Sequence, residues 1–182
     1  MKNGHYEIRF SGTGGQGMML MGDVLSQAAG CMEGKEIVLT KSYGPESRGG
    51  ACRAELIVDD KFINYPTIVS PDFVLAMSQK ACDDYHSDLE ADGKLLIDSD
   101  LVLSIPKSVK NVYSIPLTKI ARETTGKEIT ANAVALGVIA VLAEVASVES
   151  IFNAVMEKFP KNLRKINETA FNAGVEAAKT LL

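Results

Sequence analysis

The sequence has few of the residues that bind metals or contact nucleic acids. It contains no Trp, only two His and three Cys, and its 19 basic residues are outnumbered by 23 acidic ones, for a net charge of −4. The cysteines are Cys31, Cys52 and Cys82, and no two of them form a Cys-x-x-Cys pair. We therefore expect this chain to assemble neither a zinc site nor an iron–sulfur ligand set. Nucleic-acid binding is not expected either, because there is no basic surplus and aromatic residues are few.

Long apolar runs are also missing. The first six residues contain no apolar signal core, and the most apolar stretch, residues 133–143, is too short to span a bilayer and is followed directly by Glu144. We expect a cytoplasmic protein without membrane contact, whose cysteines are reduced and act as small apolar side chains. The 182 residues, 46% of them hydrophobic, fit one domain that spans residues 1–182.

A glycine-rich stretch, Gly12-Thr13-Gly14-Gly15-Gln16-Gly17, organises the N-terminal part of the chain. Residues 5–10 before it alternate like a short strand, and residues 18–29 after it lack proline and favour a helix. In a strand–glycine turn–helix arrangement, backbone N–H groups and a helix N-terminus converge on an anion. The pattern predicts either such an anion site or a tight turn without a ligand.

A second polar loop is expected at the same edge of the sheet. Residues 36–40 read as the next strand, so the chain opens with a βαβ unit whose strands run parallel, with a right-handed crossover. The loop that follows has the sequence Lys41-Ser42-Tyr43-Gly44-Pro45-Glu46-Ser47-Arg48-Gly49-Gly50. Turn chemistry accounts for its glycines and proline but not for Glu46 and Arg48. Because both loops leave the carboxyl ends of parallel strands, Arg48 is a candidate for contacting an anion at the glycine turn.

The remaining elements indicate an α/β protein. Residues 51–58 and 62–65 are predicted to pair as an antiparallel hairpin, residues 72–77 read as a buried strand, and further strands are expected at 94–98 and 111–116. Helices are expected at 78–91, 117–125, 130–146, 147–159 and 162–182. We predict a three-layer α/β/α fold with a mixed, mainly parallel sheet and a helical C-terminal part.

Two apolar segments raise the question of a partner surface. The predicted helix 130–146 is hydrophobic on all sides except at its ends, and residues 18–21 read Met-Met-Leu-Met. Such segments either lie in the core or are covered by another chain. If they are exposed, the isolated chain should associate with itself.

One functional class is a free-standing Rossmann-like protein that binds NADP or another phosphorylated ligand. A carboxylate at the end of the second strand would hold the cofactor's ribose, but Thr40-Lys41-Ser42 stands there. Lys41 could suit a 2′-phosphate, but the mixed sheet disfavours the regular doubly wound topology.

The second class rests on a resemblance. The segments GTGGQG and SYGPESRGG at their spacing, followed by PDFVLAMSQKA and GKLLIDSD, resemble the gamma subunit of 2-oxoacid:ferredoxin oxidoreductases. The resemblance covers residues 8–100 clearly and the helical remainder in layout. The YGPE form looks most like the 2-oxoglutarate type, with the pyruvate and branched-chain types close.

The resemblance implies an enzyme complex that converts a 2-oxoacid, CoA and oxidised ferredoxin to acyl-CoA, carbon dioxide and reduced ferredoxin. It also implies that thiamine diphosphate, magnesium and the iron–sulfur clusters are held by partners, namely thiamine-binding alpha and beta subunits and a ferredoxin-like subunit or ferredoxin. This chain would contribute to assembly and to the CoA side of the reaction. It would bind no cofactor alone and would not be active alone.

Carried over by position, the implied binding residues lie in the two loops. They are Gly12, Gly14, Gly15, Gln16, Gly17, Tyr43, Gly44, Glu46, Arg48 and Gly49. They would contact either CoA or a partner subunit, and Glu46 and Arg48 could instead bond to each other. We assign no catalytic residue and no metal ligand.

Overall fold

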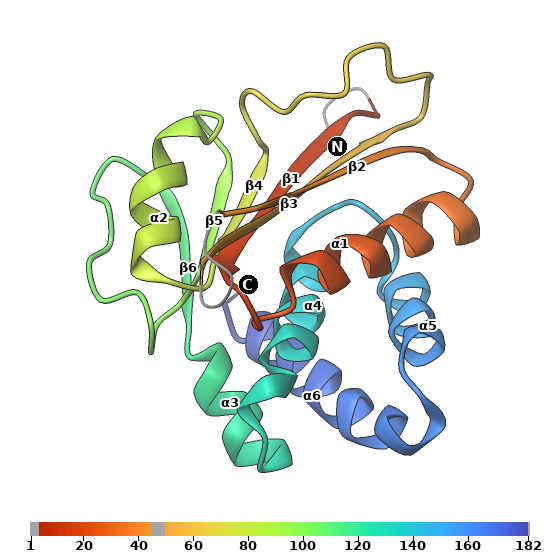
Figure 1. Ribbon diagram of the computed structural model, residues 1–182, viewed down its shortest axis with the longest axis vertical. Helices are drawn as coiled ribbons and strands as arrows, with labels where there is room; N and C mark the ends of the chain where they lie inside the picture. The colour runs from red at the N-terminus through yellow and green to blue at the C-terminus, as the bar shows by residue number, and fades with distance from the viewer. Residues whose placement is uncertain (1–3, 45–49, 182) are drawn as a thin grey trace.

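The computed structural model describes residues 4–44 and 50–181 (Figure 1). The sequence predictions for most elements are confirmed, with ends shifted by a few residues. The strands are β1 (Tyr6–Thr13), β2 (Glu36–Tyr43), β3 (Ala51–Asp59), β4 (Phe73–Ala76), β5 (Lys94–Asp98) and β6 (Asn111–Ile115). The helices are α1 (Met18–Ser26), α2 (Gln79–Tyr85), α3 (Leu117–Thr125), α4 (Ala131–Leu142), α5 (Val148–Lys158) and α6 (Lys161–Lys179).

The strands form one mixed sheet in the order β2-β3-β1-β4-β5-β6. The pairs β1–β4, β4–β5 and β5–β6 are parallel, whereas β3 is antiparallel to both β1 and β2. The predicted mixed, mainly parallel sheet is confirmed. β1 and β2 run in the same direction, as the βαβ prediction requires, but β3 lies between them.

The predicted hairpin of residues 51–58 with 62–65 is wrong. β3 forms its hairpin with β2 instead, in a register that sets Tyr43 opposite Cys52. Its other edge pairs with β1, so neither edge of β3 is left for a returning strand. Residues 62–65 therefore form no strand, and the side chains of Phe62 and Tyr65 are largely exposed.

Helices cover both faces of the sheet, as the three-layer prediction requires. Alternate strand residues such as Ile8, Phe10 and Leu75 face the larger core beneath α1, α4 and the other C-terminal helices. The intervening residues of β4 and β5, including Val74 and Ile97, form a smaller core with α2. Figure 1 shows α2 on one side of the sheet, with α1 and α4 to α6 on the other. The period-two alternation of the strands accounts for the two cores.

Helix α4 lies at the centre of the larger core. Every residue from Ala131 to Ala140 is buried, as are Met18 and Met21 of α1. The two apolar segments that raised the question of a partner therefore pack within this chain. α4 approaches α6 closely, because a Cβ at Gly137 would lie 2.1 Å from the Phe171 carbonyl oxygen. In the described part of the chain, no helix combines the length and the apolar character needed to cross a bilayer.

Candidate functional site

The carboxyl ends of the parallel strands bring the predicted loops to one edge of the sheet. The turn after β1 leads into α1 on one face, whereas the chain after β4 leads into α2 on the other face (Figure 1). β1 and β4 are adjacent, so this is a point where the connections switch faces. Ligands of open α/β sheets bind in the crevice at such a point. The expected position of the glycine turn is therefore confirmed.

The glycines of the turn adopt the conformations that a turn into a helix requires. Gly15 has φ of 99° and Gly17 has φ of 85°, both in the left-handed region that glycine favours. Gly17 is the N-cap of α1, which has no side-chain cap and no acid in its first turn. A Cβ at Gly15 would meet no atom within 4 Å, so the backbone is open to a ligand there. The positive end of α1 is thus available to an anion.

Gln16 builds the turn with both of its side-chain polar atoms. Its Nε2 donates to the Met77 carbonyl oxygen at 2.7 Å, and its Oε1 accepts from the Thr13 N–H at 2.7 Å. The side chain thereby ties the end of β1 to the end of β4. A Cβ at Gly12 would lie 2.4 Å from Gln16 Oε1, so Gly12 is needed for this contact.

The second loop meets the glycine turn through the start of β3. The Gly14 N–H donates to the Gly50 carbonyl oxygen at 2.9 Å, and the Gly44 N–H donates to the Ala51 carbonyl oxygen at 2.7 Å. Tyr43, at the end of β2, is 71% exposed. The predicted site residues Glu46, Arg48 and Gly49 lie outside the described residues.

A hollow of about 330 Å³ opens beside the glycine turn, between α3 and the start of α4. Gly15 and the apolar side chains of Met77, Leu101 and Ile129 are among the residues that line it, with Thr118 and Glu128. α4 continues directly from the 3₁₀ turn Glu128–Thr130, whose first turn contains the acid Glu128. The uncapped N-terminus of α1 therefore lies beside this hollow, in a partly apolar setting.

Asn132 is a residue of this region that the sequence reasoning missed. It is only 7% exposed, and its Oδ1 is buried with no hydrogen-bond partner among the described residues. A Cβ at Gly17 would lie 2.4 Å from Asn132 Nδ2, so the amide packs against the N-cap of α1. An unpaired buried polar atom is costly, which makes it a candidate for pairing with a ligand or a water molecule. The sequence signal was available, because Asn132 is the one polar side chain in residues 131–142.

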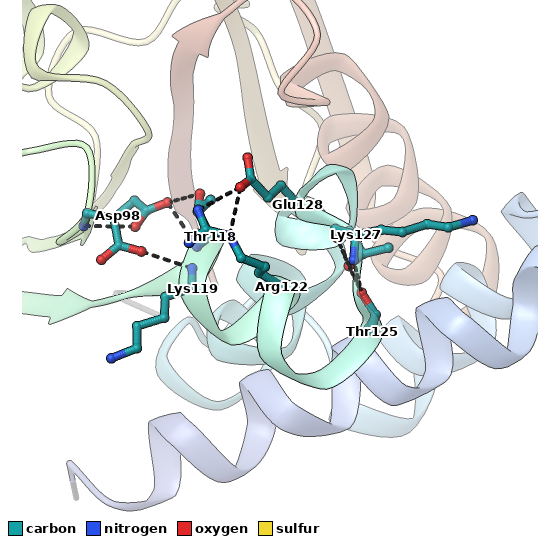
Figure 2. A network of polar contacts seen from close by, with 9 residues as sticks. Asp98, Thr118, Lys119, Arg122, Thr125, Lys127 and Glu128 are labelled. Atoms are coloured by element: carbon teal, nitrogen blue, oxygen red, sulfur yellow. Dashed lines mark hydrogen bonds and ion pairs between the residues drawn. The ribbon is translucent and has the colours of Figure 1, made fainter.

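The position of α3 beside the hollow is fixed by the buried carboxylate of Asp98, which the sequence reasoning also missed. Asp98, at the end of β5, is fully buried, and its Oδ2 accepts from the Thr118 N–H at 3.1 Å and from the Thr118 hydroxyl (Figure 2). Burial is the largest effect on this group and raises the pKa of the Asp98 carboxyl, partly offset by the Thr118 bonds. Asp98 thus caps α3 and sets the position of Thr118.

An ion pair borders the hollow above α3. Arg122 Nε and Nη2 lie 2.7 Å and 2.6 Å from the same oxygen, Oε1 of Glu128. Figure 2 shows the Glu128 carboxylate facing Arg122. Both side chains are more than half exposed. Glu128 is therefore the one acid among the described residues of the lining, and Arg122 of α3 is paired with it.

Groups that would hold a metal or a Rossmann cofactor are not assembled. Within residues 4–44 and 50–181, no three His, Cys, Asp or Glu side chains are placed to bind a metal ion. Lys41 Nζ lies 2.6 Å from Asp23 Oδ1 in an ion pair, so Lys41 is not free for a 2′-phosphate. The antiparallel β3 between β1 and β2 also departs from the doubly wound order. The NADP-binding alternative is not supported.

Comparison with known proteins identifies relatives over nearly the whole chain. The family "Pyruvate ferredoxin/flavodoxin oxidoreductase" matches residues 7–177. A Methanocaldococcus jannaschii protein named 2-oxoglutarate synthase subunit KorC is 42% identical over 177 residues, which cover 96% of this chain and 95% of that protein. The crystal structure of the gamma subunit of a keto/oxoacid ferredoxin oxidoreductase from Geobacter sulfurreducens is 41% identical, with a TM-score of 0.86 over 96% of this chain and 99% of that one.

A longer relative shares the fold. The 2-oxoglutarate:ferredoxin oxidoreductase from Magnetococcus marinus, with 2-oxoglutarate, coenzyme A and succinyl-CoA bound, has a TM-score of 0.87 at 23% identity. The match covers 98% of this chain and 32% of that chain. The same fold therefore occurs both as a separate subunit and as part of a longer polypeptide.

Proposed function

We infer the function from one premise, that the chain belongs to the pyruvate ferredoxin/flavodoxin oxidoreductase family. The chain is the gamma subunit of a multi-subunit 2-oxoacid:ferredoxin oxidoreductase. The observation that carries this conclusion is the end-to-end similarity to separate subunits, with 42% sequence identity to the M. jannaschii protein, and with 41% sequence identity and a TM-score of 0.86 to the G. sulfurreducens subunit. The name of the M. jannaschii relative favours 2-oxoglutarate as the oxoacid.

The reaction is the oxidative decarboxylation of a 2-oxoacid to acyl-CoA, with ferredoxin as the electron acceptor. In this proposal, as the family resemblance implies, thiamine diphosphate, magnesium and the iron–sulfur clusters belong to partner subunits. The partners are thiamine-binding alpha and beta subunits and a ferredoxin-like subunit or ferredoxin. No chemical step is assigned to a side chain of this chain. Its exposed free cysteine, Cys31, fits a reducing cytoplasmic compartment.

The hollow beside the glycine turn is the CoA-binding region of this subunit. The N-terminus of α1 would attract phosphate oxygens, and the Gly15 backbone is open to close approach. In this proposal Gly12, Gly14 and Gln16 shape the turn, and Tyr43 and Gly44 lead into the loop from which Arg48 would contact CoA.

Copurification tests the assignment. The chain is isolated at its natural level from its source organism, and its complexes are weighed by native mass spectrometry. Thiamine-binding and ferredoxin-like chains should accompany it in defined stoichiometry. A protein recovered without these chains that binds NADP would overturn the assignment and restore the Rossmann-like alternative.

A further inference from the structure

We propose that Arg122 is an anion-binding residue of the hollow and that the Glu128 carboxylate pairs with Arg122 until a phosphorylated ligand binds. The ligand's phosphate would replace the Glu128 carboxylate as the partner of Arg122. This inference rests on the proposed function, in which the phosphorylated ligand is CoA.

The geometry places the guanidinium beside the space that a ligand would fill. Glu128 lines the hollow together with Gly15 of the glycine turn. Arg122 donates through Nε and Nη2 to the single oxygen Oε1 of Glu128, at 2.7 Å and 2.6 Å. A phosphate that displaces Glu128 would meet the same two donors, which suit bidentate binding.

The pair is weak enough to be exchanged. The Arg122 and Glu128 side chains are 60% and 57% exposed, and exposed ion pairs contribute little to stability. A phosphate carries more negative charge than a carboxylate and offers three acceptor oxygens. The swap would therefore leave Arg122 with a stronger partner and would move the acidic side chain away from the hollow.

The lining of the hollow carries little charge of its own. Glu128 is the one acid among the described residues that line it. Moving that carboxylate away would leave the described lining without an acid, which favours an anionic ligand.

A purely structural role for the pair predicts a different pattern. If Arg122 and Glu128 only stabilise the turn between α3 and α4, removing either side chain would loosen this wall and weaken ligand binding. If Glu128 competes with the ligand, its removal has the opposite effect to the removal of Arg122. The sign of the Glu128 effect therefore distinguishes the two roles.

The experiment measures CoA use and CoA binding in the assembled enzyme with Arg122→Gln and Glu128→Gln. We expect about 5- to 30-fold weaker CoA binding and a matching rise in the KM for CoA for Arg122→Gln, because a charge-assisted bond is lost. Glu128→Gln should bind CoA several-fold more tightly. Pantetheine, which has no phosphate, should bind equally well to the wild type and to Arg122→Gln.

Matched controls come from α6, where Lys165 and Glu168 form a similar surface pair at 3.6 Å. Lys165→Gln and Glu168→Gln make the same charge changes and should leave CoA binding unchanged. Weaker CoA binding by Glu128→Gln, or unchanged binding by Arg122→Gln, in an enzyme that assembles and uses CoA would overturn this inference alone. A wild-type chain that forms no such enzyme would instead overturn the proposed function.

Discussion

The close packing of α6 against α4 holds in position the helix that begins beside the hollow, and the substitution Gly174→Ala tests this packing. A Cβ at Gly174 would lie 2.0 Å from the Val134 carbonyl oxygen, and one at Gly137 would lie 2.1 Å from the Phe171 carbonyl oxygen. An ordinary carbon–oxygen contact is about 3.3 Å or more, so the two helices would have to separate by about 1 Å. Because α4 begins at Ala131, beside the hollow, this separation would also disturb the site.

The expected cost follows from the atoms involved. Overpacking a core by one methyl group usually costs about 1–3 kcal/mol, and the cost should reach the upper end here because the atom that clashes belongs to the backbone. The helix-propensity gain of Gly→Ala offsets at most about 1 kcal/mol of this. We expect a net loss of about 2–3 kcal/mol in the free energy of unfolding. For a chain of this length that corresponds to a fall in Tm of roughly 4–12 °C.

Thermal and urea unfolding of the purified chain measure this loss. Gly22→Ala is the matched control, because Gly22 is also within a helix but its added Cβ would meet side-chain atoms only: Leu39 Cδ1 at 2.8 Å, which can rotate away, and Ala54 Cβ at 3.3 Å, which needs a shift of a few tenths of an ångström. Its propensity gain is the same, so Gly174→Ala should be the more destabilised of the two variants because its clash is with the backbone. A Gly174→Ala protein that unfolds at or above the wild-type Tm would refute the reasoning.

Three further predictions follow from the sequence and the structure. Arg48→Ala should raise the KM for CoA about 10- to 150-fold in the assembled enzyme, with the KM for the oxoacid nearly constant. An unchanged KM for CoA in steady-state kinetics would contradict this. A second prediction concerns His5, whose Nδ1 lies 2.7 Å from Asp59 Oδ2 and whose Nε2 lies 3.2 Å from Glu7 Oε1. Desolvation, the largest effect, lowers its pKa, but the bonds and charges of Asp59 and Glu7 together raise it above the ordinary value. The stability that His5 contributes should therefore be present below about pH 6.5 and lost as the pH rises through the folded-state pKa. The Tm values of the wild type and His5→Gln should differ at pH 6 and converge at pH 9. A Tm difference that stays the same at both pH values would count against this. The isolated chain should not reduce a viologen dye with any 2-oxoacid and CoA, and measurable reduction would contradict its role as a subunit.

Local patterns predicted the elements that depend on local chemistry. The glycine turn was recognisable because positive φ is restricted mainly to glycine, and Gly15 and Gly17 adopt it. The helix expected at 147–159 begins with a residue type that favours an N-cap, and the Ser147 side chain accepts from the Ser150 N–H at 3.1 Å. A continuous apolar run predicted β4, which is buried on both faces.

One prediction failed on strand pairing, and one question about burial stayed open until the structure was known. The residues of 62–65 suit a strand, but whether a strand forms depends on a free sheet edge, and β3 already has β1 and β2 on its edges. The apolar segment 131–142 could have faced another chain until α6 and the sheet were known to cover it. Sequence alone does not decide between two hydrophobic environments.

Tertiary contacts show why the residues that were missed matter. Asn132 matters because of the unpaired Oδ1 and the neighbouring Gly17, and Arg122 matters because of the acid that holds it beside the hollow. Gln16 was predicted as a binding residue, and the structure shows its polar side-chain atoms bonded to Thr13 and Met77. Its part in ligand binding stays a prediction.

Reconstitution of the enzyme with and without this chain tests the central claim most directly. The thiamine-binding and ferredoxin-like subunits of the same organism are combined with and without the chain, and CoA-dependent reduction of ferredoxin by 2-oxoglutarate is measured. We predict activity only when the chain is present and incorporated into the complex. Full CoA-dependent activity without the chain would contradict its assignment as the gamma subunit.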